Sequence, residues 1–552
     1  MIASEVHMQY MDEAFDKNGV VCKSELMLPD NFNYAYDIID KIAKCEPRRR
    51  SMIWCDDEGR KREFTYGEFS KLSNRAANLF LDMGIKKGDR VMAILKRHWE
   101  IWIVALALDK IGAVLVPATN QLKKKDYVFR FRSGEIKAIV ATGDGEVTSN
   151  IEAAELEYPL EKRFIVKGTR DGWIDFDGLL MEYSDKLERI PTNVDDDNLM
   201  FFSSGTTGYP KMVMHSHRYG AAHIPTAKYW HNINADSIHL TISESGWGKF
   251  FWGKYYGQLA LGATVMTYDF TRFVPADVLR IIEEYKVTSL CCPPTMYRFF
   301  IKEGMSGYDI SSLRYATTAG EALNSEVYTR FFEYTGLKLM EGFGQTETVL
   351  IIGNPYNSVT RSGSMGKAMP LFNVIVADPD GNECPPDVTG EICVKLRDGV
   401  NNGIFKGYVN NPEANAKAFS NGLYHTGDTA YKDKDGYFWY VGRVDDVIKS
   451  SGYRIGPFEI ESILMEHPAV LECAITAAPD PIRGQVVKAT IVLTNKYKDN
   501  AGDELADELK KFVKANTAPY KYPRIIEFVD ELPKTISGKI RRVEIRERDN
   551  KK

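Results

Sequence analysis

Short apolar runs alternate with amphipathic segments through the first two thirds of the chain. The runs predict buried strands at residues 90–95, 138–142, 263–267, 287–292 and 313–316. Between them, apolar residues recur at helical spacing, which predicts helices at residues 66–83, 275–285 and 324–334. Strands and helices that alternate in this way are typical of parallel, doubly wound α/β sheets.

The pattern changes after about residue 365. Closely spaced strand-like runs are then separated by Gly, Pro and Asp, as at residues 378–381 and 433–436. This part of the chain predicts an antiparallel or barrel-like subdomain. The sequence contains no internal repeat or low-complexity segment.

Composition adds limits on the number of domains and on the partners. A chain of 552 residues that is 44% hydrophobic can bury several cores, so two or more domains are expected. The net charge of −5 and the dispersed Lys and Arg residues do not indicate nucleic acid as a partner. The longest apolar run, residues 102–108, is far below the ~18 residues of a membrane span, and the N-terminus is acidic where a signal peptide is basic. We therefore expect a cytoplasmic protein without a membrane span.

The eight cysteines include no Cys-x-x-Cys pair, and only Cys291 and Cys292 are adjacent. The spacing therefore indicates neither a zinc cluster nor a disulfide framework. Reduced, structural thiols are expected.

One loop combines hydroxyls, glycines and a lysine directly after the apolar run 199–202, and so predicts a site for the phosphates of ATP. The residues expected to contact phosphate are Ser203, Ser204, Gly205, Thr206, Thr207, Gly208 and Lys211. A Walker A loop is excluded, because Pro210 and Met212 stand where it needs glycine and a Ser or Thr hydroxyl. A flexible surface turn is the alternative for this string alone.

Further strings follow in a fixed order. They are Gly320-Glu321-Ala322-Leu323, Glu341-Gly342-Phe343-Gly344-Gln345-Thr346-Glu347-Thr348, Tyr424-His425-Thr426-Gly427-Asp428, Gly442-Arg443-Val444-Asp445-Asp446, Ser451-Gly452-Tyr453-Arg454 and Pro533-Lys534-Thr535-Ile536-Ser537-Gly538-Lys539. In this order, over about residues 200–542, they resemble the adenylate-forming superfamily of acyl-CoA synthetases, peptide-synthetase adenylation domains and luciferases.

The resemblance implies a fold and a division into domains. A large N-terminal AMP-binding and acyl-binding domain, residues 1–444, would combine two doubly wound α/β subdomains with a distorted β-barrel subdomain. A small, mobile α+β domain, residues 445–552, would follow a hinge at Asp445. Rotation about that hinge would let one active site serve two half-reactions in turn.

The same resemblance implies roles for the charged residues. Lys539 would reach between the carboxylate and the α-phosphate, whereas Arg541 and Arg542 are expected to be solvated tail residues. Glu347 would bind Mg²⁺, unless it only favours a helix start, and Thr346 would contact phosphate. The remaining nucleotide contacts would come from Gly320, Glu321, Ala322, Glu341, Gly342, Phe343, Gln345, Asp428, Arg443 and Arg454. Among these, Asp428 suits the ribose hydroxyls and Arg443 the ribose or the α-phosphate.

Coenzyme A is the expected acceptor of the acyl group. Gly452 and Tyr453 resemble the loop that borders the pantetheine tunnel of acyl-CoA synthetases, where a missing side chain lets a thiol arm pass. A carrier-protein acceptor and luciferase chemistry are the alternatives within the superfamily. A homodimer is compatible with the sequence but is not specified by it.

The acid is expected to be longer than acetate. Acetyl-CoA synthetases have a tryptophan where this chain has Gly344, so the pocket should be deeper, and each buried methylene contributes about 0.8 kcal/mol. Trp247 and Trp252 would form its aromatic wall, with Lys249 at the mouth or shortening the pocket, and Cys291 facing the cavity. A short-to-medium or branched acid is predicted, and a benzoate-like aryl acid is the second choice. An idle adenylate-binding protein of the same fold is the alternative from another class.

Overall fold

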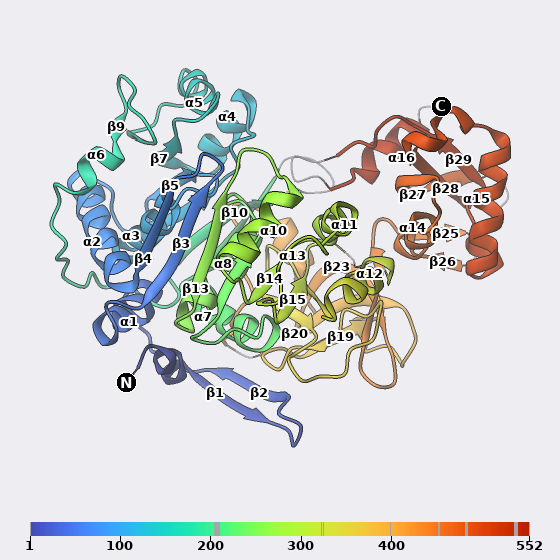
Figure 1. Ribbon diagram of the computed structural model, residues 1–552, viewed down its shortest axis with the longest axis horizontal. Helices are drawn as coiled ribbons and strands as arrows, with labels where there is room; N and C mark the ends of the chain where they lie inside the picture. The colour runs from blue at the N-terminus through green and yellow to red at the C-terminus, as the bar shows by residue number, and fades with distance from the viewer. Residues whose placement is uncertain are drawn as a thin grey trace.

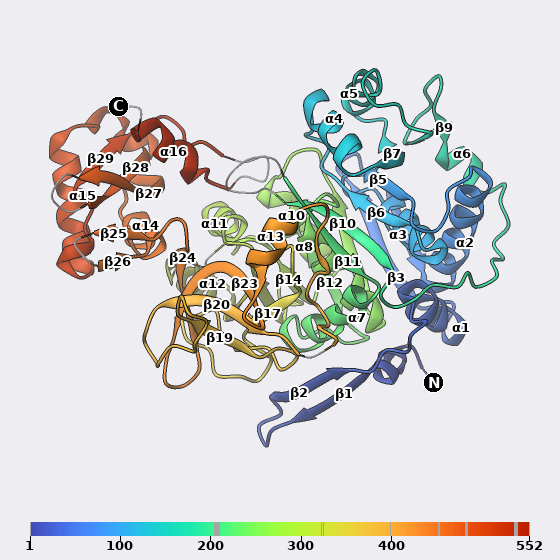
Figure 2. The same cartoon turned by 180° about the vertical axis from the view of Figure 1, so that it is seen from behind.

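The computed structural model describes residues 2–203, 210–321, 323, 325–397, 399–450, 453–480, 484–534 and 539–550. Figure 1 shows a large body and, at one side, a smaller C-terminal unit coloured red, and Figure 2 shows the same arrangement from behind. A short hairpin of β1 (Met11–Phe15) and β2 (Val21–Leu26) projects from the body near the N-terminus. Among the described residues, every helix is too short or too polar to cross a membrane.

The first sheet joins eight of the described strands in the order β21-β11-β10-β6-β5-β7-β8-β9. Its strands are β5 (Arg90–Ile94), β6 (Val114–Pro117), β7 (Ile136–Thr142), β8 (Lys162–Val166), β9 (Ile174–Asp175), β10 (Asp197–Ser203), β11 (Lys211–Ser216) and β21 (Gly407–Tyr408). The pairs from β10 to β9 are parallel. At the other edge, β11 is antiparallel to both of its neighbours, β10 and β21. The helices that follow its strands or lie near it are α2 (Tyr66–Asp82), α3 (Glu100–Ile111), α4 (Lys124–Ser133), α5 (Val147–Glu155) and α6 (Phe176–Leu180). The apolar run 102–108 is the fully buried centre of α3, which explains its length.

The second sheet joins nine of the described strands in the order β18-β17-β16-β15-β14-β12-β13-β3-β4. Its strands are β3 (Arg50–Asp56), β4 (Lys61–Thr65), β12 (Ile238–Thr241), β13 (Thr264–Asp269), β14 (Ser289–Cys291), β15 (Tyr315–Thr318), β16 (Leu339–Gly344), β17 (Leu350–Gly353) and β18 (Lys367–Ala368). Strands β3, β13, β12, β14, β15 and β16 are parallel. The helices in this part of the chain are α1 (Lys41–Cys45), α7 (Arg218–Pro225), α8 (Gly248–Lys254), α9 (Tyr256–Ala260), α10 (Pro275–Glu284), α11 (Pro294–Glu303) and α12 (Ser325–Thr335). The predicted doubly wound α/β architecture is confirmed.

A smaller antiparallel sheet follows, as predicted from the change of pattern near residue 365. It contains β19 (Val374–Ala377), β20 (Gly390–Lys395), β22 (Phe419–Ser420), β23 (Leu423–Lys432) and β24 (Phe438–Arg443), with α13 (Pro412–Ala418) beside it. A bulge in β23 lies at Thr426–Asp428, where Gly427 has φ of +71°. Bulges bend a strand and redirect its side chains, and this one lies in the predicted ribose-binding string.

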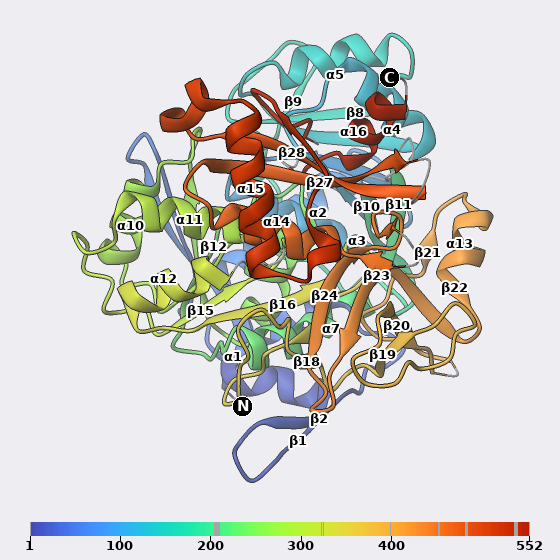
Figure 3. The same ribbon diagram turned by 90° about the vertical axis from the view of Figure 1, so that its right-hand side faces the viewer.

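The C-terminal unit has its own sheet and its own core. Its elements are β25 (Ile448–Ser450), β26 (Tyr453–Ile455), α14 (Pro457–Met465), β27 (Val470–Asp480), β28 (Gly484–Leu493), α15 (Asp503–Asn516), β29 (Ile525–Phe528) and α16 (Arg542–Asn550). Figure 3 looks at this unit, with α14 and α15 lying over its strands. Residues from Ile448 to Val513 form a separate hydrophobic cluster, as expected of a unit that folds around its own core. The boundary between residues 444 and 445 stays a prediction.

Candidate active site

The predicted phosphate-binding string connects two antiparallel strands. Strand β10 ends at Ser203 and β11 begins at Lys211, and these two residues are paired across the hairpin. A Walker A loop joins a strand to a helix instead, so the predicted exclusion of that loop agrees with the structure. Residues 204–209 lie outside the described residues, so their phosphate contacts stay predictions.

Glu347 lies in the turn after β16, close to groups from another sheet. The Tyr408 hydroxyl donates a hydrogen bond to Glu347 Oε1 at 2.9 Å, and the Lys211 ammonium lies 4.6 Å from the centre of the Tyr408 ring. Burial raises the pKa of Glu347, and the Tyr408 hydrogen bond and the charges of Arg443 and Lys211 oppose this rise. Burial disfavours the charged form of a carboxylate, and a bound cation stabilises that form. Mg²⁺ prefers hard oxygen ligands such as a carboxylate. Glu347 therefore fits the predicted Mg²⁺ ligand.

The turn that carries Glu347 is held by a residue that the sequence analysis missed. His215 Nε2 donates to the backbone oxygen of Thr346 at 2.8 Å. Burial lowers the pKa of His215 to about 3, so the ring is neutral. The only sequence signal is its place on β11, four residues after Lys211. His215 thus links β11 of the β10–β11 hairpin to the residue before Glu347.

Asp428 lies at the centre of a hydrogen-bond network between two strands. It faces Arg443 across β23 and β24, and Arg443 Nη1 donates to Asp428 Oδ2 at 3.1 Å. The Tyr440 hydroxyl donates to the other carboxylate oxygen at 3.1 Å, and Gln345 Nε2 donates to Oδ2. Gln345 is itself fixed by the Tyr424 hydroxyl at 2.7 Å. The structure therefore brings together three predicted site residues from two sheets.

Lys539 approaches the same network from the C-terminal unit. Burial raises the pKa of Asp428, and the positive charges of Arg443 and Lys539 are among the effects that oppose the rise. Lys539 itself is exposed, and residues 535–538 before it lie outside the described residues. The charge of Lys539 therefore acts on the predicted ribose-binding carboxylate, and its role in adenylation stays a prediction.

The comparison with known families agrees with this geometry. Residues 39–409 match the AMP-binding enzyme family, and residues 459–539 match the AMP-binding enzyme C-terminal domain. The chain belongs to the AMP-binding enzyme family. The superfamily predicted from the sequence is confirmed.

Individual relatives cover nearly the whole chain. Human acyl-coenzyme A synthetase ACSM3, mitochondrial, is 38% identical over 532 residues, which are 95% of this chain and 91% of the relative. Mouse acyl-coenzyme A synthetase ACSM5, mitochondrial, is 40% identical over 531 residues, with the same two shares. The solved structure of the anthranilate CoA ligase AuaEII with anthranoyl-AMP has a TM-score of 0.85 and 27% identity, and the match covers 95% of this chain and 98% of that one. The predicted class of AMP-forming acid–thiol ligase is confirmed.

The expectation that Arg542 is a solvated tail residue is wrong. In this AMP-binding enzyme Arg542 Nη2 bonds both carboxylate oxygens of Glu461 at 2.7 Å, and the guanidinium lies 3.7 Å from Asp446. Arg546 also pairs with Asp446. Asp446 follows the predicted hinge residue Asp445, so both arginines tie the hinge to α16, which begins shortly after Lys539. The sequence showed the charges of the C-terminus but not their partners, which are up to 100 residues away.

The predicted coenzyme A loop is described only in part. Ser451 and Gly452 lie outside the described residues, and Tyr453 and Arg454 are described as backbone of β26 only. Their predicted contacts with coenzyme A and nucleotide stay predictions.

The segment after β15 is held by Glu341 from the neighbouring strand β16. The Glu341 carboxylate is buried and accepts the backbone N–H of Leu323 at 3.1 Å. Glu341 therefore positions the segment that contains Gly320 and Glu321, and its predicted contact with the nucleotide stays a prediction. Ala322 lies outside the described residues, and Phe343 is half-buried beside Tyr440. At Gly342 an added Cβ would lie 2.8 Å from the Trp230 ring, which explains the glycine by packing.

Replacing Glu341 with glutamine should make stability less dependent on pH. Burial raises the pKa of Glu341 to about 7, so the folded chain disfavours the ionised carboxylate. The protonated side chain contributes to stability at low pH, and this contribution is lost as pH rises from about 4.5 through 7. Glutamine keeps the acceptor for Leu323 but cannot ionise. The free energy of unfolding is measured with urea at pH 5 and pH 8. Between these two pH values it should fall by up to about 3 kcal/mol more in the wild type than in Glu341→Gln. The exposed Glu413→Gln is the control, and an equal pH dependence in Glu341→Gln and wild type would contradict the assignment.

Gly344, which is expected to deepen the acyl pocket, is packed closely against its neighbours. A Cβ added there would lie 2.5 Å from the backbone oxygen of Val349 and 2.8 Å from Trp252 Cη2. A tryptophan at position 344 would therefore displace the Trp252 ring. The predicted effect of Gly344 on the depth of the pocket thus depends on Trp252 as well, and it stays a prediction.

The other pocket residues lie around α8. Trp247 caps this helix and is half-buried, whereas Trp252 within it is buried. Lys249 Nζ donates to the backbone oxygen of Ala319 at 2.8 Å, so its charge is directed toward the segment of Gly320 and away from an apolar wall. Cys291 is buried at the end of β14. Helix α8 thus supplies the aromatic side chains predicted for this wall.

Proposed function

We propose that this AMP-binding enzyme converts a short-to-medium or branched carboxylic acid, longer than acetate, with ATP and coenzyme A to acyl-CoA, AMP and pyrophosphate. The observation that carries the proposal is the pair of Asp428 and Arg443 at 3.1 Å, because the charge of Arg443 also acts on Glu347 and the charge of Lys539 acts on Asp428. The relatives named as acyl-coenzyme A synthetases support the choice of acid and thiol.

In the first half-reaction the acid's carboxylate attacks the α-phosphorus of ATP, and pyrophosphate leaves. Lys539 would place its charge between carboxylate and α-phosphate, where negative charge concentrates in the transition state. Asp428 would accept hydrogen bonds from the ribose hydroxyls, and Lys211 with the loop before it would hold the leaving phosphates. Mg²⁺ held by Glu347 would neutralise charge on the phosphate oxygens. Thr346, whose backbone is fixed by His215, would add its hydroxyl to the phosphate contacts.

In the second half-reaction the thiol of coenzyme A attacks the acyl adenylate and AMP leaves. The loop of Gly452 and Tyr453 would border the path of the pantetheine arm. For this step the domain of residues 445–552 would rotate about Asp445, removing Lys539 from the site. Because Asp446 is paired with Arg542 and Arg546 on α16, the residue after the pivot and the base of the Lys539 loop would move as one body.

An aryl acid is the second candidate. The aromatic side chains of Trp247 and Trp252 on one helix would suit a flat ring as well as an alkyl chain. The anthranilate CoA ligase, which shares the fold over nearly the whole chain, supports this alternative.

Product analysis across a panel of acids tests the proposal. The full chain is incubated with ATP, Mg²⁺, coenzyme A and acids from two to ten carbons, with benzoate included. We expect AMP and pyrophosphate, with a maximum of kcat/KM for an acid longer than acetate, and each well-buried methylene should raise kcat/KM by up to about fourfold. A maximum at benzoate would select the aryl alternative. ADP as the product would overturn the proposal. No acid-dependent ATP–pyrophosphate exchange with any acid would also overturn it and would favour an idle adenylate-binding protein.

A further inference from the structure

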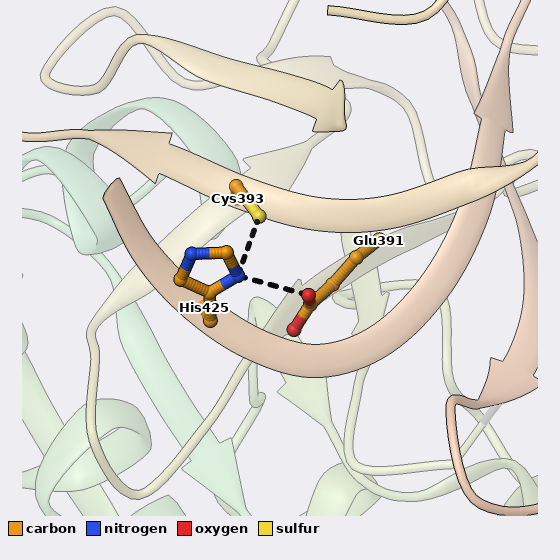
Figure 4. Close-up of side chains that lie close together, drawn as sticks. All are labelled: Glu391, Cys393 and His425. Carbon is orange, nitrogen blue, oxygen red and sulfur yellow. Dashed lines mark hydrogen bonds and ion pairs between the residues drawn. The ribbon is translucent and has the colours of Figure 1, made fainter. Parts of the chain in front are cut away.

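Three side chains that can bind a cation meet on the small antiparallel sheet. Figure 4 shows Glu391 and Cys393 on one strand and His425 on its neighbour, all directed toward one point. Glu391 and Cys393 are two residues apart on β20 and so share a face, and Cys393 is paired with His425 of β23. His425 Nδ1 lies 2.9 Å from Glu391 Oε2 and 3.5 Å from Cys393 Sγ.

Hydrogen bonding alone does not satisfy this cluster. If His425 Nδ1 carries its proton and donates to Glu391, it has no lone pair left for the Cys393 thiol. If Nδ1 accepts from the thiol, it faces the carboxylate without a proton. A sulfur, an imidazole nitrogen and a carboxylate oxygen that share one focus are the donor set of a zinc ion.

We propose that Glu391 Oε2, Cys393 Sγ and His425 Nδ1 form a zinc-binding site. The usual lengths of zinc bonds to nitrogen, oxygen and sulfur require about 3.3–3.5 Å between ligand atoms in a tetrahedron. The three atoms already lie within 4.8 Å of one another, and the pair of Cys393 and His425 is at 3.5 Å. The contact between His425 and Glu391 at 2.9 Å has to open by about 0.4 Å. A water would complete the tetrahedron.

The sequence concealed this site because its ligands are not close in the chain. No Cys-x-x-Cys pair is present, and His425 follows Cys393 by 32 residues. Antiparallel pairing of β20 and β23 brings them face to face. The expectation of structural thiols without a zinc site was therefore based on local spacing, which cross-strand ligands do not follow.

The site is connected to the ribose-binding string. Glu391 Oε1 accepts the backbone N–H of Gly427 at 2.8 Å, so one carboxylate joins the metal cluster to the bulge of Thr426–Asp428. An ion bound to Glu391 would fix that bulge from the side of β20, while Arg443 and Tyr440 hold Asp428 from β24. Zinc would therefore act on the shape of the nucleotide site without taking part in the reaction.

Two other interpretations predict different behaviour. An ion pair of protonated His425 with Glu391 would leave Cys393 without a role and would bind no metal. A redox-active Cys393 would require an accessible thiol, but Cys393 is fully buried. Metal binding distinguishes the zinc site from both.

Cobalt and zinc are the probes. The full chain is freed of metal with a chelator and titrated with Co²⁺ in the absence and presence of Mg²⁺–ATP. We expect one Co²⁺ per chain, with the intense near-ultraviolet absorption of a cobalt–thiolate bond, unchanged by Mg²⁺–ATP because the Glu347 site has only oxygen ligands. Zn²⁺ should displace Co²⁺ and should raise the midpoint of thermal unfolding.

Matched variants separate this site from other thiols. Cys393→Ser should abolish the thiolate band and the rise in its own unfolding midpoint on addition of Zn²⁺. Its midpoint without metal should lie below that of the wild type, because Cys393 is fully buried. Cys473→Ser, at a buried cysteine in the C-terminal unit whose Sγ contacts Glu461, should leave both effects intact. No thiolate band in the wild type, or a band that persists in Cys393→Ser, would overturn the proposal.

Discussion

Replacing Lys539 with alanine should slow formation of the acyl adenylate about 100-fold or more. This is the scale for loss of one preorganised group that stabilises charge in a transition state. The positive charge of Lys539 is among the effects that oppose the rise in the pKa of Asp428, so it already acts on a carboxylate of the proposed nucleotide site. Acid-dependent ATP–pyrophosphate exchange measures the effect. Transfer of a preformed acyl adenylate to coenzyme A should be changed far less, because Lys539 acts only in the first step.

Lys534→Ala is the control for that experiment. Lys534 belongs to the same segment but pairs with Glu472 at 2.7 Å, within the C-terminal unit. Its replacement should leave exchange within a few fold of the wild type. Exchange near the wild-type rate in Lys539→Ala would remove Lys539 from the mechanism.

Replacing Glu347 with glutamine should lower the rate of adenylation about 100-fold and should increase the Mg²⁺ concentration required. The amide keeps the size of the side chain and an acceptor for the Tyr408 hydroxyl, but it loses the charge that would hold the metal. Pyrophosphate exchange measured across a series of Mg²⁺ concentrations separates weaker metal binding from a slower chemical step.

Tyr408→Phe is the matched control for Glu347. It removes the 2.9 Å hydrogen bond to Oε1 and leaves the carboxylate in place, so a loss below about tenfold is expected. If Glu347→Gln behaves like Tyr408→Phe at every Mg²⁺ concentration, Glu347 is not the metal ligand.

Much of the fold follows from local patterns in the sequence. The run 138–142 is the end of β7, and residues 66–83 form α2 within one residue, because Thr65 accepts from the Glu68 N–H and Glu68 returns a bond to the Thr65 N–H. Apolar periodicity and caps act over a few residues, so a reader of the sequence can find them. The order of strands across a sheet depends on distant pairings, such as β21 with β11, which no local pattern contains.

Site residues could be predicted where they belong to short sequence motifs, and not where their position depends on packing. Asp428 and Arg443 were found in separate strings, and their pairing follows from the register of β23 and β24. His215 was missed because it contacts a backbone oxygen, which leaves no mark on the sequence of its partner. The packing of Trp252 beside Gly344 was missed for the same reason, since the sequence around a glycine does not show which distant side chain lies against it.

Lys211, Glu347 and Asp428 come from three different sheets: Lys211 is on β11, Glu347 follows β16 and Asp428 is on β23. A nucleotide bound to all three would be a noncovalent cross-link, and the free energy of its binding would add to the stability of the folded chain. Resistance to heat and to proteases would then rise with the concentration of ATP. The lifetime of the protein would depend on the supply of its own substrate.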